Sequence, residues 1–439
     1  TGQRKAAAYF GNPKSISGGA VWNSLTSACG AGKNSAFLCG KGDILNTQTP
    51  GGNRLETGAF RRQLGPLLLL TSIFFLNFCG RVVFAPMMPT VESALNFGHA
   101  QAGSLFFLIS IGYFLSLFGS GWVAARLIHR HTILLSTSIL GFTLIAVSFC
   151  NSLTLLRIGL FLLGAAAGLY LPSGIAAMTH MVESRHWGKA AAVHELAPNL
   201  ALVIAPLVTE MLLARFTWRA VPLVFGSGAL VVSVLFLRYS RIGGFTGRPP
   251  DPSAFRDLLS RPALWIMMLL FGLGISSTLG VYTMLPLYLV ADMGLDRSAA
   301  NTLLALSRVS GLIMALFGGW AADRFGPKRT IVAVLMLTGG ATAAIGAIPG
   351  IGALVAVFAQ PLLAVCFFPA GFAALSRIGP ASDRNIAVSL TIPAAFLIGG
   401  GAVPAMIGWF GDHVTFGAGI MLVGLLIASG GFLAHFLDL

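Results

Sequence analysis

Long apolar runs are the feature of this sequence that most restricts its fold. We count twelve of them from Leu64 onward, and short polar breaks separate most neighbours. A run of about 18 or more apolar residues is long enough to cross a bilayer as one helix. The runs cover approximately residues 64–89, 101–125, 132–150, 153–179, 189–213, 219–238, 263–290, 299–322, 330–348, 352–376, 386–409 and 416–436. We therefore expect twelve transmembrane helices, most of them antiparallel to the next.

Composition also favours a membrane protein and argues against an enzyme. Only 10% of residues are charged and mean hydropathy is +0.83, whereas soluble domains carry about 25% charged residues. A net charge of +14 is compatible with nucleic-acid binding, but the bases fall at the ends of apolar runs, as in membrane proteins. The five cysteines show no metal or disulfide spacing. With no nucleophile constellation or nucleotide motif, we expect no catalytic residue, cofactor, metal or nucleic-acid partner.

Two polar segments divide the chain. Residues 1–62 are basic and rich in Gly, Ser and Asn, which predicts a disordered N-terminal tail, with a transit peptide as the alternative. Residues 239–262 hold several arginines and prolines and separate six apolar runs from six. We therefore expect a cytoplasmic central loop between two six-helix bundles, residues 63–238 and 263–439. The fold class is an all-α membrane protein with twelve transmembrane helices in two pseudo-symmetric bundles.

Basic residues predict the orientation in the membrane. Lys and Arg gather in the tail, in the central loop and after the even-numbered runs, whereas the opposite loops hold only Arg215, Arg219 and Arg297. Loops on the cytoplasmic side carry the excess of positive charge. We therefore expect a multi-pass protein of the cytoplasmic (inner or plasma) membrane, with both termini in the cytoplasm.

One of the cytoplasmic loops occurs twice. Residues 319–330 read GWAADRFGPKRT, and residues 121–132 read GWVAARLIHRHT. Gly, Trp, Ala, Arg and Thr recur in register, each time after the second run of a six-run half. The repetition indicates an internal duplication.

The second copy resembles the loop G-x-x-x-D-R-x-G-x-[KR]-[KR] of the major facilitator superfamily of secondary transporters, and the resemblance extends over about residues 64–436. It implies that this loop latches the inside-closed state of the transporter. In the first copy Ala125 stands at the acidic position and Ile128 at the second glycine, so we expect a weakened latch there. The residues to which the resemblance assigns gating are Gly319, Asp323, Arg324, Gly326 and Arg126.

Arg81 is the first candidate for binding cargo. It lies deep in the first run, where an ionisable side chain is costly unless it faces a partner or a polar cavity. Guanidinium suits bidentate binding of carboxylate, phosphate or sulfate. The segment resembles the first span of the organophosphate and anion-symporter branches, whose substrate-binding Arg stands eight residues before a Pro, as Arg81 does before Pro89. The alternative is an arginine that pairs with a helix end or snorkels outward.

Arg308 is the corresponding candidate in the second half. Monocarboxylate, oxalate and nitrate carriers of the superfamily also use an arginine in the eighth span, although theirs lies closer to the loop. One arginine in each half would let an anion draw the halves together. Further lining is expected from Asn77, Tyr113, Tyr170, Ser276, Ser277, Tyr282, Gln360 and Phe368.

His194 and Glu195 are the candidates for proton coupling. Glu195 is the only acid well inside a run, and a buried carboxyl or an imidazole can exchange a proton near neutral pH. A structural ion pair with an intramembrane arginine is the alternative. Glu210, near the outer end of the same run, is expected to pair with Arg215 or Arg219.

These observations predict a monomeric transporter that moves a small organic anion across the lipid bilayer by proton-coupled alternating access. Two alternatives remain open. An exporter of amphipathic drugs or metabolites would have a cavity of aromatic and Met side chains, with its arginines paired to Glu195. A non-transporting receptor or assembly factor would have a sealed or lipid-filled cavity.

Overall fold

The computed structural model describes residues 52–183, 186–247, 252–378 and 384–437. The chain separates into a unit of residues 1–53 and a compact unit of residues 54–439. The expected disordered tail, residues 1–62, lies mostly outside the described residues, and helix α1 already begins at Gly52. The description below concerns the second unit.

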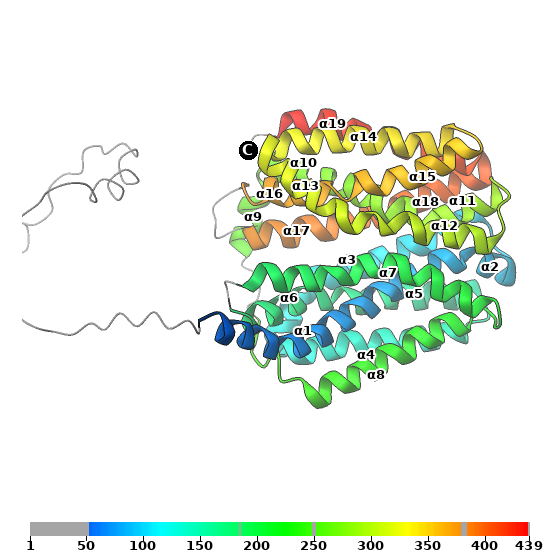
Figure 1. Cartoon of the computed structure of the whole chain (residues 1–439). Coiled ribbons are helices and arrows are strands. Elements are labelled where there is room, and N and C mark those ends of the chain that lie inside the picture. Colours follow the sequence, from blue (N-terminus) through cyan, green and yellow to red (C-terminus); the bar gives the residue numbers. More distant parts are fainter. Residues whose placement is uncertain (1–51, 184–185, 248–251, 379–383, 438–439) are drawn as a thin grey trace, which may run out of the picture. The chain divides into compact units, whose positions relative to one another are not determined.

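The second unit is built of helices (Figure 1). Its first part, here called the N-half, contains α1 (Gly52–Val82), α2 (Phe84–Leu95), α3 (His99–Arg126), α4 (His129–Ser148), α5 (Leu153–Gly168), α6 (Tyr170–Met181), α7 (Trp187–Leu213) and α8 (Ala220–Tyr239). A short helix follows, α9 (Pro252–Leu259). The C-half contains α10 (Pro262–Ile275), the π-helix η2 (Ser276–Gly280), α11 (Val281–Ala291), α12 (Arg297–Val309), α13 (Gly311–Phe325), α14 (Pro327–Ala347), α15 (Ile351–Ala364), α16 (Phe367–Leu375), α17 (Arg384–Phe396), the π-helix η4 (Leu397–Ala402), α18 (Val403–His413), α19 (Phe416–Leu433) and the 3₁₀ turn η5 (Ala434–Phe436).

The expected all-α membrane fold is confirmed. Eleven helical segments among the described residues are long and apolar enough to cross a membrane. The remaining run, 299–322, is divided at Ser310 into the shorter helices α12 and α13. The only β-type pairing within the described ranges is one isolated bridge, between Ile128 and Thr246.

Three of the breaks within spans fall about one turn before a proline. The first span breaks at Val83, three residues before Pro86, and the fourth at Leu169, three residues before Pro172. Proline has no N–H and its ring clashes with the carbonyl four residues earlier, so the preceding turn cannot stay regular. The tenth span breaks in the same way before Pro369. These three spans are therefore interrupted helices, whereas spans such as α3 and α14 are continuous.

Small residues let particular helices pack closely. A Cβ at Gly164 of α5 would collide with the carbonyl of Ile109 in α3, and one at Gly424 of α19 would collide with the backbone of Ala343 in α14. These are α3–α5 in the N-half and α14–α19 in the C-half, whose contacts are among the most extensive in each half. Close approach through small side chains is the usual means of helix association in membranes.

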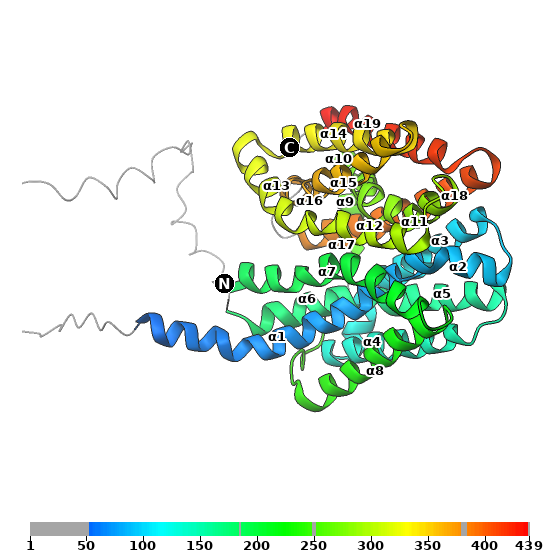
Figure 2. The ribbon, with the colours of Figure 1, turned by 45° about the vertical axis from the view of Figure 1, so that its right-hand side comes forward.

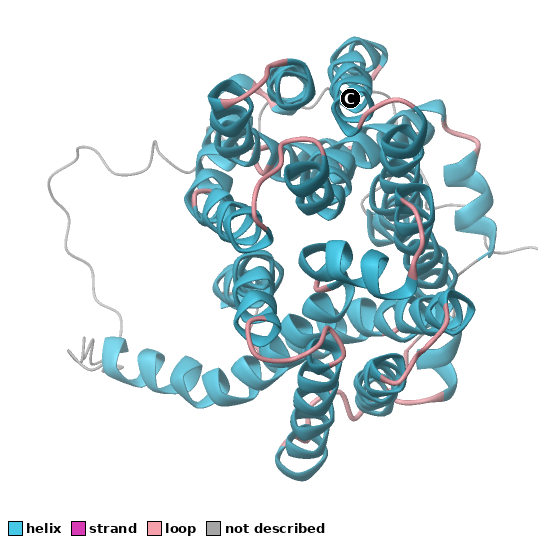
Figure 3. Ribbon diagram, turned by 90° about the vertical axis from the view of Figure 1, so that its right-hand side faces the viewer, coloured by secondary structure: helices cyan, strands magenta, loops and turns pink. Residues whose placement is uncertain are grey.

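The two halves lie side by side with their helices running in the same general direction (Figures 1 and 2). Helix α3 packs against α17 and α18, α7 against α12, and α2 against α11. Figure 3 views the unit along these helices. We call the face of the unit at which α3 finishes and α14 starts the terminal end. The opposite face, at which α3 starts and α7 finishes, is the distal end.

Candidate functional site between the two halves

Arg81 lies where the halves meet, near the middle of the first span. Its side chain is buried, with 6% of the residue exposed. The guanidinium carbon lies 4.3 Å from the ring centroid of Tyr113, 4.7 Å from that of Phe78 and 5.3 Å from that of Phe396. The first two rings belong to the N-half and Phe396 to the C-half. Aromatic side chains from both halves therefore surround one cation.

This cation has no counterion among the described residues. Arg81 forms no ion pair there, and its buried Nε has no hydrogen-bond partner. Each ring contact stabilises a cation by about 0.5–2 kcal/mol, whereas burying an unpaired charge costs several kcal/mol. The rings offset only part of this cost. The arrangement is therefore suited to accept an anionic group.

A small cavity adjoins the guanidinium. It measures about 20 Å³ and is lined from both halves, by Arg81, Val82, Phe106, Ile109, Ser110, Tyr113, Leu279, Thr283, Phe396 and Gly400. A space of this size accommodates about one water molecule. In this structure the site is therefore contracted, and a larger guest requires the side chains or the halves to move apart.

Arg308 has similar surroundings in the C-half. Its residue is 6% exposed, its Nε has no partner, and its guanidinium carbon lies 4.9 Å from the ring centroid of Tyr282. The Tyr282 hydroxyl donates to the carbonyl of Leu202 in α7 at 3.2 Å, so this ring also lies against the N-half. Arg308 is not part of the lining of the cavity beside Arg81. The structure thus buries both arginines near the interface but does not bring them into one cavity.

Two of the predicted lining amides are engaged in helix packing. Asn77 donates through Nδ2 to the carbonyl of Ala167, next to the break between α5 and α6, at 3.1 Å. Gln360 donates through Nε2 to the carbonyl of Ser277, in the π-helix η2, at 2.5 Å. Carbonyls at helix irregularities lack their regular partners, and these side chains supply one. A role in binding cargo remains a prediction for both.

His194 and Glu195 differ in burial, although Nδ1 of the imidazole lies 3.8 Å from Oε1 of the carboxylate. The imidazole is 1% exposed, stacks on Phe74 with ring centroids 4.4 Å apart, and has Nε2 3.0 Å from the Tyr170 hydroxyl. Because that hydroxyl donates to the carbonyl of Leu70 at 2.9 Å, its oxygen is left to accept from Nε2–H. His194 is therefore held within the N-half.

The Glu195 carboxylate is solvent-accessible. Its side chain is 61% exposed, and it lies close enough to Tyr113 and Tyr170 to act on both phenols electrostatically. Tyr113 is also the ring that lies against Arg81. Of the two predicted proton-coupling residues, Glu195 is the exposed one and His194 the buried one, and proton coupling stays a prediction for both.

The second copy of the repeated loop is exposed at the terminal end. Asp323 and Arg324 are exposed and bond to no other described residue, and Arg126 of the first copy is exposed as well. Gly326 has φ +85°, a conformation that only glycine adopts readily. Gly319 has an open surrounding, because a Cβ there would first meet Pro369 at 4.0 Å.

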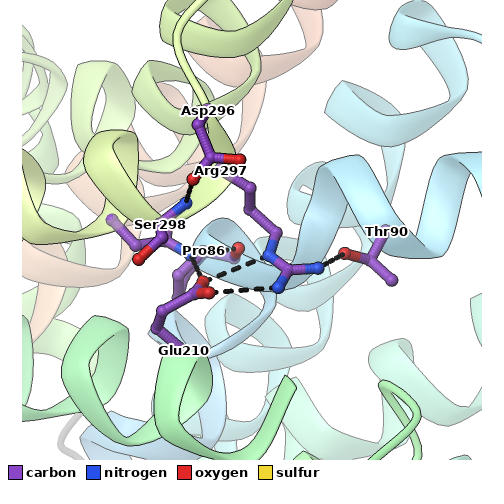
Figure 4. A network of polar contacts seen from close by, with 7 residues as sticks. Pro86, Thr90, Glu210, Asp296, Arg297 and Ser298 are labelled. Atoms are coloured by element: carbon purple, nitrogen blue, oxygen red, sulfur yellow. Dashed lines mark hydrogen bonds and ion pairs between the residues drawn. The ribbon is translucent and has the colours of Figure 1, made fainter. Parts of the chain in front are cut away.

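A polar network joins the halves at the distal end (Figure 4). Arg297 of α12 donates through Nε and Nη2 to the two carboxylate oxygens of Glu210 in α7, at 3.1 and 3.0 Å. Asn301 donates to Glu210 and to the carbonyl of Pro86, and Arg297 also reaches Thr90. The expected pairing of Glu210 with Arg215 or Arg219 is wrong, because the partner comes from the other half. Sequence proximity could not indicate a partner 87 residues away.

Comparison with known proteins identifies the family. A profile described as Major Facilitator Superfamily matches residues 70–351 and 280–438. The chain belongs to the Major Facilitator Superfamily. The multidrug resistance protein MdtL of Escherichia coli O17:K52:H18 (strain UMN026 / ExPEC) is 24% identical over 347 residues, covering 78% of this chain and 86% of that protein. The protein of the same name from Shigella dysenteriae serotype 1 (strain Sd197) is 23% identical over the same shares.

Solved structures of superfamily members share the fold. A bacterial homologue of the human lysosomal transporter Spinster, in an inward-facing and occupied conformation, superposes with a TM-score of 0.68 at 17% identity, covering 85% of this chain and 94% of that one. A POT family transporter in complex with 5-aminolevulinic acid gives a TM-score of 0.70 at 13% identity, covering 84% and 95%.

Because the chain belongs to this superfamily, the distal network can be interpreted as a contact that closes one end. Superfamily transporters are built of two halves that alternately open at each end around a site near the bilayer midplane. Among the described residues, every side-chain hydrogen bond or ion pair between the halves lies at the distal end or at the level of Tyr282. The structure therefore represents a state in which hydrogen bonds and an ion pair between the halves close the distal end.

Proposed function

We propose that this chain is a secondary active transporter whose cargo is a small organic anion, bound by Arg81 near the middle of the membrane. The observation that carries the proposal is a buried guanidinium that has no counterion among the described residues and is enclosed by aromatic rings from both halves. A carboxylate or phosphate would supply the missing charge and accept from Nε–H. The rings would cover an apolar part of the same molecule. Because both halves contribute, binding would draw them together.

The positive-inside rule supports placing the terminal end in the cytoplasm of a cell whose plasma or inner membrane holds the protein, with both termini on that side. The distal network then closes the outer face. In this state Asp323 and Arg324 bond through their side chains to no described residue. In the alternate state they would latch the cytoplasmic face by bonding across the halves.

We propose Glu195 as the proton carrier. Its side chain is exposed, and its carboxylate acts electrostatically on Tyr113, whose ring lies against Arg81. An ionised Glu195 would compete electrostatically with an anion for the guanidinium, so protonation and anion binding would favour each other. Anion and proton would then move together.

Export of amphipathic drugs or metabolites is the second candidate. It is favoured by the two multidrug-resistance relatives and by the rings around Arg81. The arginines are not paired to Glu195 among the described residues, which favours the anion carrier. The two candidates differ in cargo charge, which an experiment can separate.

The deciding experiment screens ligands by thermal shift on the full-length purified protein. Carboxylates, sugar phosphates and inorganic anions are compared with lipophilic cations of similar size, for wild type and Arg81→Gln. Stabilisation by an organic anion that disappears in Arg81→Gln supports the proposal. Stabilisation by lipophilic cations alone, equal in both proteins, would contradict it and support drug export.

A further inference from the structure

A second group of charges gathers at the distal end, away from Arg81. His99 is the first residue of α3, and its Nδ1 lies 3.0 Å from both carboxylate oxygens of Glu92 in α2. A short turn joins α2 to α3, so these two side chains belong to the same hairpin of the N-half. They can stay together whether the distal end is open or closed.

The C-half brings a carboxylate to the same place. Asp412 of α18 accepts from the backbone N–H of His99 at 2.9 Å and from that of Ala100 at 2.8 Å. A side chain of one half thereby caps a helix of the other, satisfying two donors that the helix cannot satisfy itself. Gly98 permits the approach, because a Cβ there would lie 3.0 Å from the Asp412 carboxylate.

Carboxylates from three elements act on the imidazole electrostatically. Glu92 of α2 contacts its Nδ1, Asp412 of α18 accepts from the backbone N–H of His99, and Asp292, directly after α11, accepts from the backbone N–H of Gly417. The ring of Phe416 in α19 covers it, with centroids 4.7 Å apart. Two of the three acids and the ring belong to the C-half. Opening the distal end would remove them and leave Glu92 alone.

We propose that His99 is a proton-binding site that links pH to closure of the distal end. A proton on the imidazole faces three carboxylates when this end is closed and one when it is open, so it stabilises the closed state. By reciprocity, closure increases the affinity for that proton. Without the proton, three like charges meet at the contact and favour separation. The N-terminus of α3 disfavours a cation, but Asp412 occupies it. Lower pH therefore favours closure.

The proposal rests on alternating access and is independent of the nature of the cargo. The pair Arg297–Glu210 lies at the same end and joins the halves through bonds that do not involve His99. It supplies one part of the closure, and His99 adds a part that depends on pH. Failure of anion binding at Arg81 would leave this proposal untouched, and the reverse also holds.

The test measures the distance between the halves in the full chain. Native cysteines are replaced, spin labels are placed at Gln101 and Val414, which are exposed at the distal end of each half, and the protein is reconstituted in lipid nanodiscs. Between about pH 8 and pH 5, where histidine titrates, the ratio of closed to open distances should rise by about 5- to 150-fold, the usual range of such couplings. His99→Gln should remove this dependence. His413→Gln is the matched control, because that imidazole bonds within its own helix.

Two further variants separate the contributions. Asp412→Asn should reduce the size of the change, since one cross-half charge is lost. Glu92→Gln should keep the size but move the midpoint to lower pH, since Glu92 faces His99 in both states. A wild-type pH dependence retained in His99→Gln overturns the proposal, as does a wild-type ratio that does not change with pH. If His99→Gln does not fold, Asp412→Asn carries the same test, and an undiminished pH response in it overturns the proposal.

Discussion

Replacing Arg81 by glutamine should move cargo binding and protein stability in different directions. Glutamine retains a polar side chain of similar reach but removes the charge. The variant loses three ring contacts, each worth about 0.5–2 kcal/mol. It also removes the burial of an unpaired cation, which costs several kcal/mol. The two effects are of similar size, so the empty protein should be as stable as wild type or more stable.

Binding should respond much more strongly. Truncating one partner of a buried, hydrogen-bonded charge pair costs about 2–5 kcal/mol. At 1.4 kcal/mol per factor of ten, this corresponds to a loss in affinity of about 30- to 4000-fold. The loss should be common to all accepted anions, because it concerns the anionic group and not the rest of the molecule.

The assay is calorimetric titration of the organic anion found in the thermal-shift screen, together with the melting temperature of the empty protein. Arg157→Gln is the matched control, because Arg157 lies part-buried in α5 of the same half and outside the lining of the cavity at Arg81. An affinity that is unchanged in Arg81→Gln would refute the binding role. A marked loss of stability in the empty variant would show that Arg81 instead supports the fold.

Three further substitutions test the site, the distal network and the packing. Glu195→Gln should abolish proton-driven accumulation in proteoliposomes but retain counterflow exchange; pH-driven uptake that persists would contradict the role of Glu195. Arg297→Gln should weaken distal closure by about 1.5–3 kcal/mol, the usual worth of hydrogen bonds to charged groups, and should speed labelling of a cysteine at Thr90 at every pH; unchanged labelling would count against it. Gly164→Ala should lower stability by about 1–3 kcal/mol through overpacking against Ile109. Gly119→Ala, with no atom within 4 Å of the added Cβ, is its control, and equal melting temperatures would contradict the packing argument.

Hydrophobic runs predicted the spans closely because length and apolarity decide which segments can cross a bilayer. The first run, expected at 64–89, corresponds to the span Gln63–Leu95. Some of the irregularities, such as the break before Pro86, lie next to a proline, whereas α7 contains Pro198 and Pro206 without a break. The break at Ser310 was missed, because it involves no proline. It falls at the pair Ser310–Gly311, and Gly/Ser pairs are among the usual sites of helix kinks.

The sequence indicated which charges are unusual but not what they meet. Arg81 and Tyr113 could be chosen because each is polar or aromatic within an apolar run. Phe396 could not, because one phenylalanine among 32 carries no distinguishing signal. Glu195 and His194 were grouped as neighbours, yet adjacent helical residues point about 100° apart. That rotation places the imidazole inside the N-half and leaves the carboxylate exposed.

The two copies of the repeated loop have acquired different partners, and this difference bears on which one can act as a latch. In the first copy, the backbone N–H groups of His129 and Arg130 donate to the carbonyls of Phe245 and Gly243, and the ring of Phe245 packs on His129. The segment that follows α8 therefore packs on this loop and accepts hydrogen bonds from its backbone.

In the second copy, Lys328 donates to the carbonyls of His435 and Leu437 at the end of the chain's last helix, while Asp323 remains without a bond to any described residue. A latch between the halves must use groups that are free when the latch is open. In the first copy, the backbone N–H groups of His129 and Arg130 already bond to the segment that follows α8, and Ala125 stands in place of the acid. We therefore expect Asp323→Asn to destabilise closure at the terminal end, whereas restoring an acid by Ala125→Asp should change it little. A distance measurement across that end in both variants would decide, and an equal effect of the two substitutions would contradict the argument.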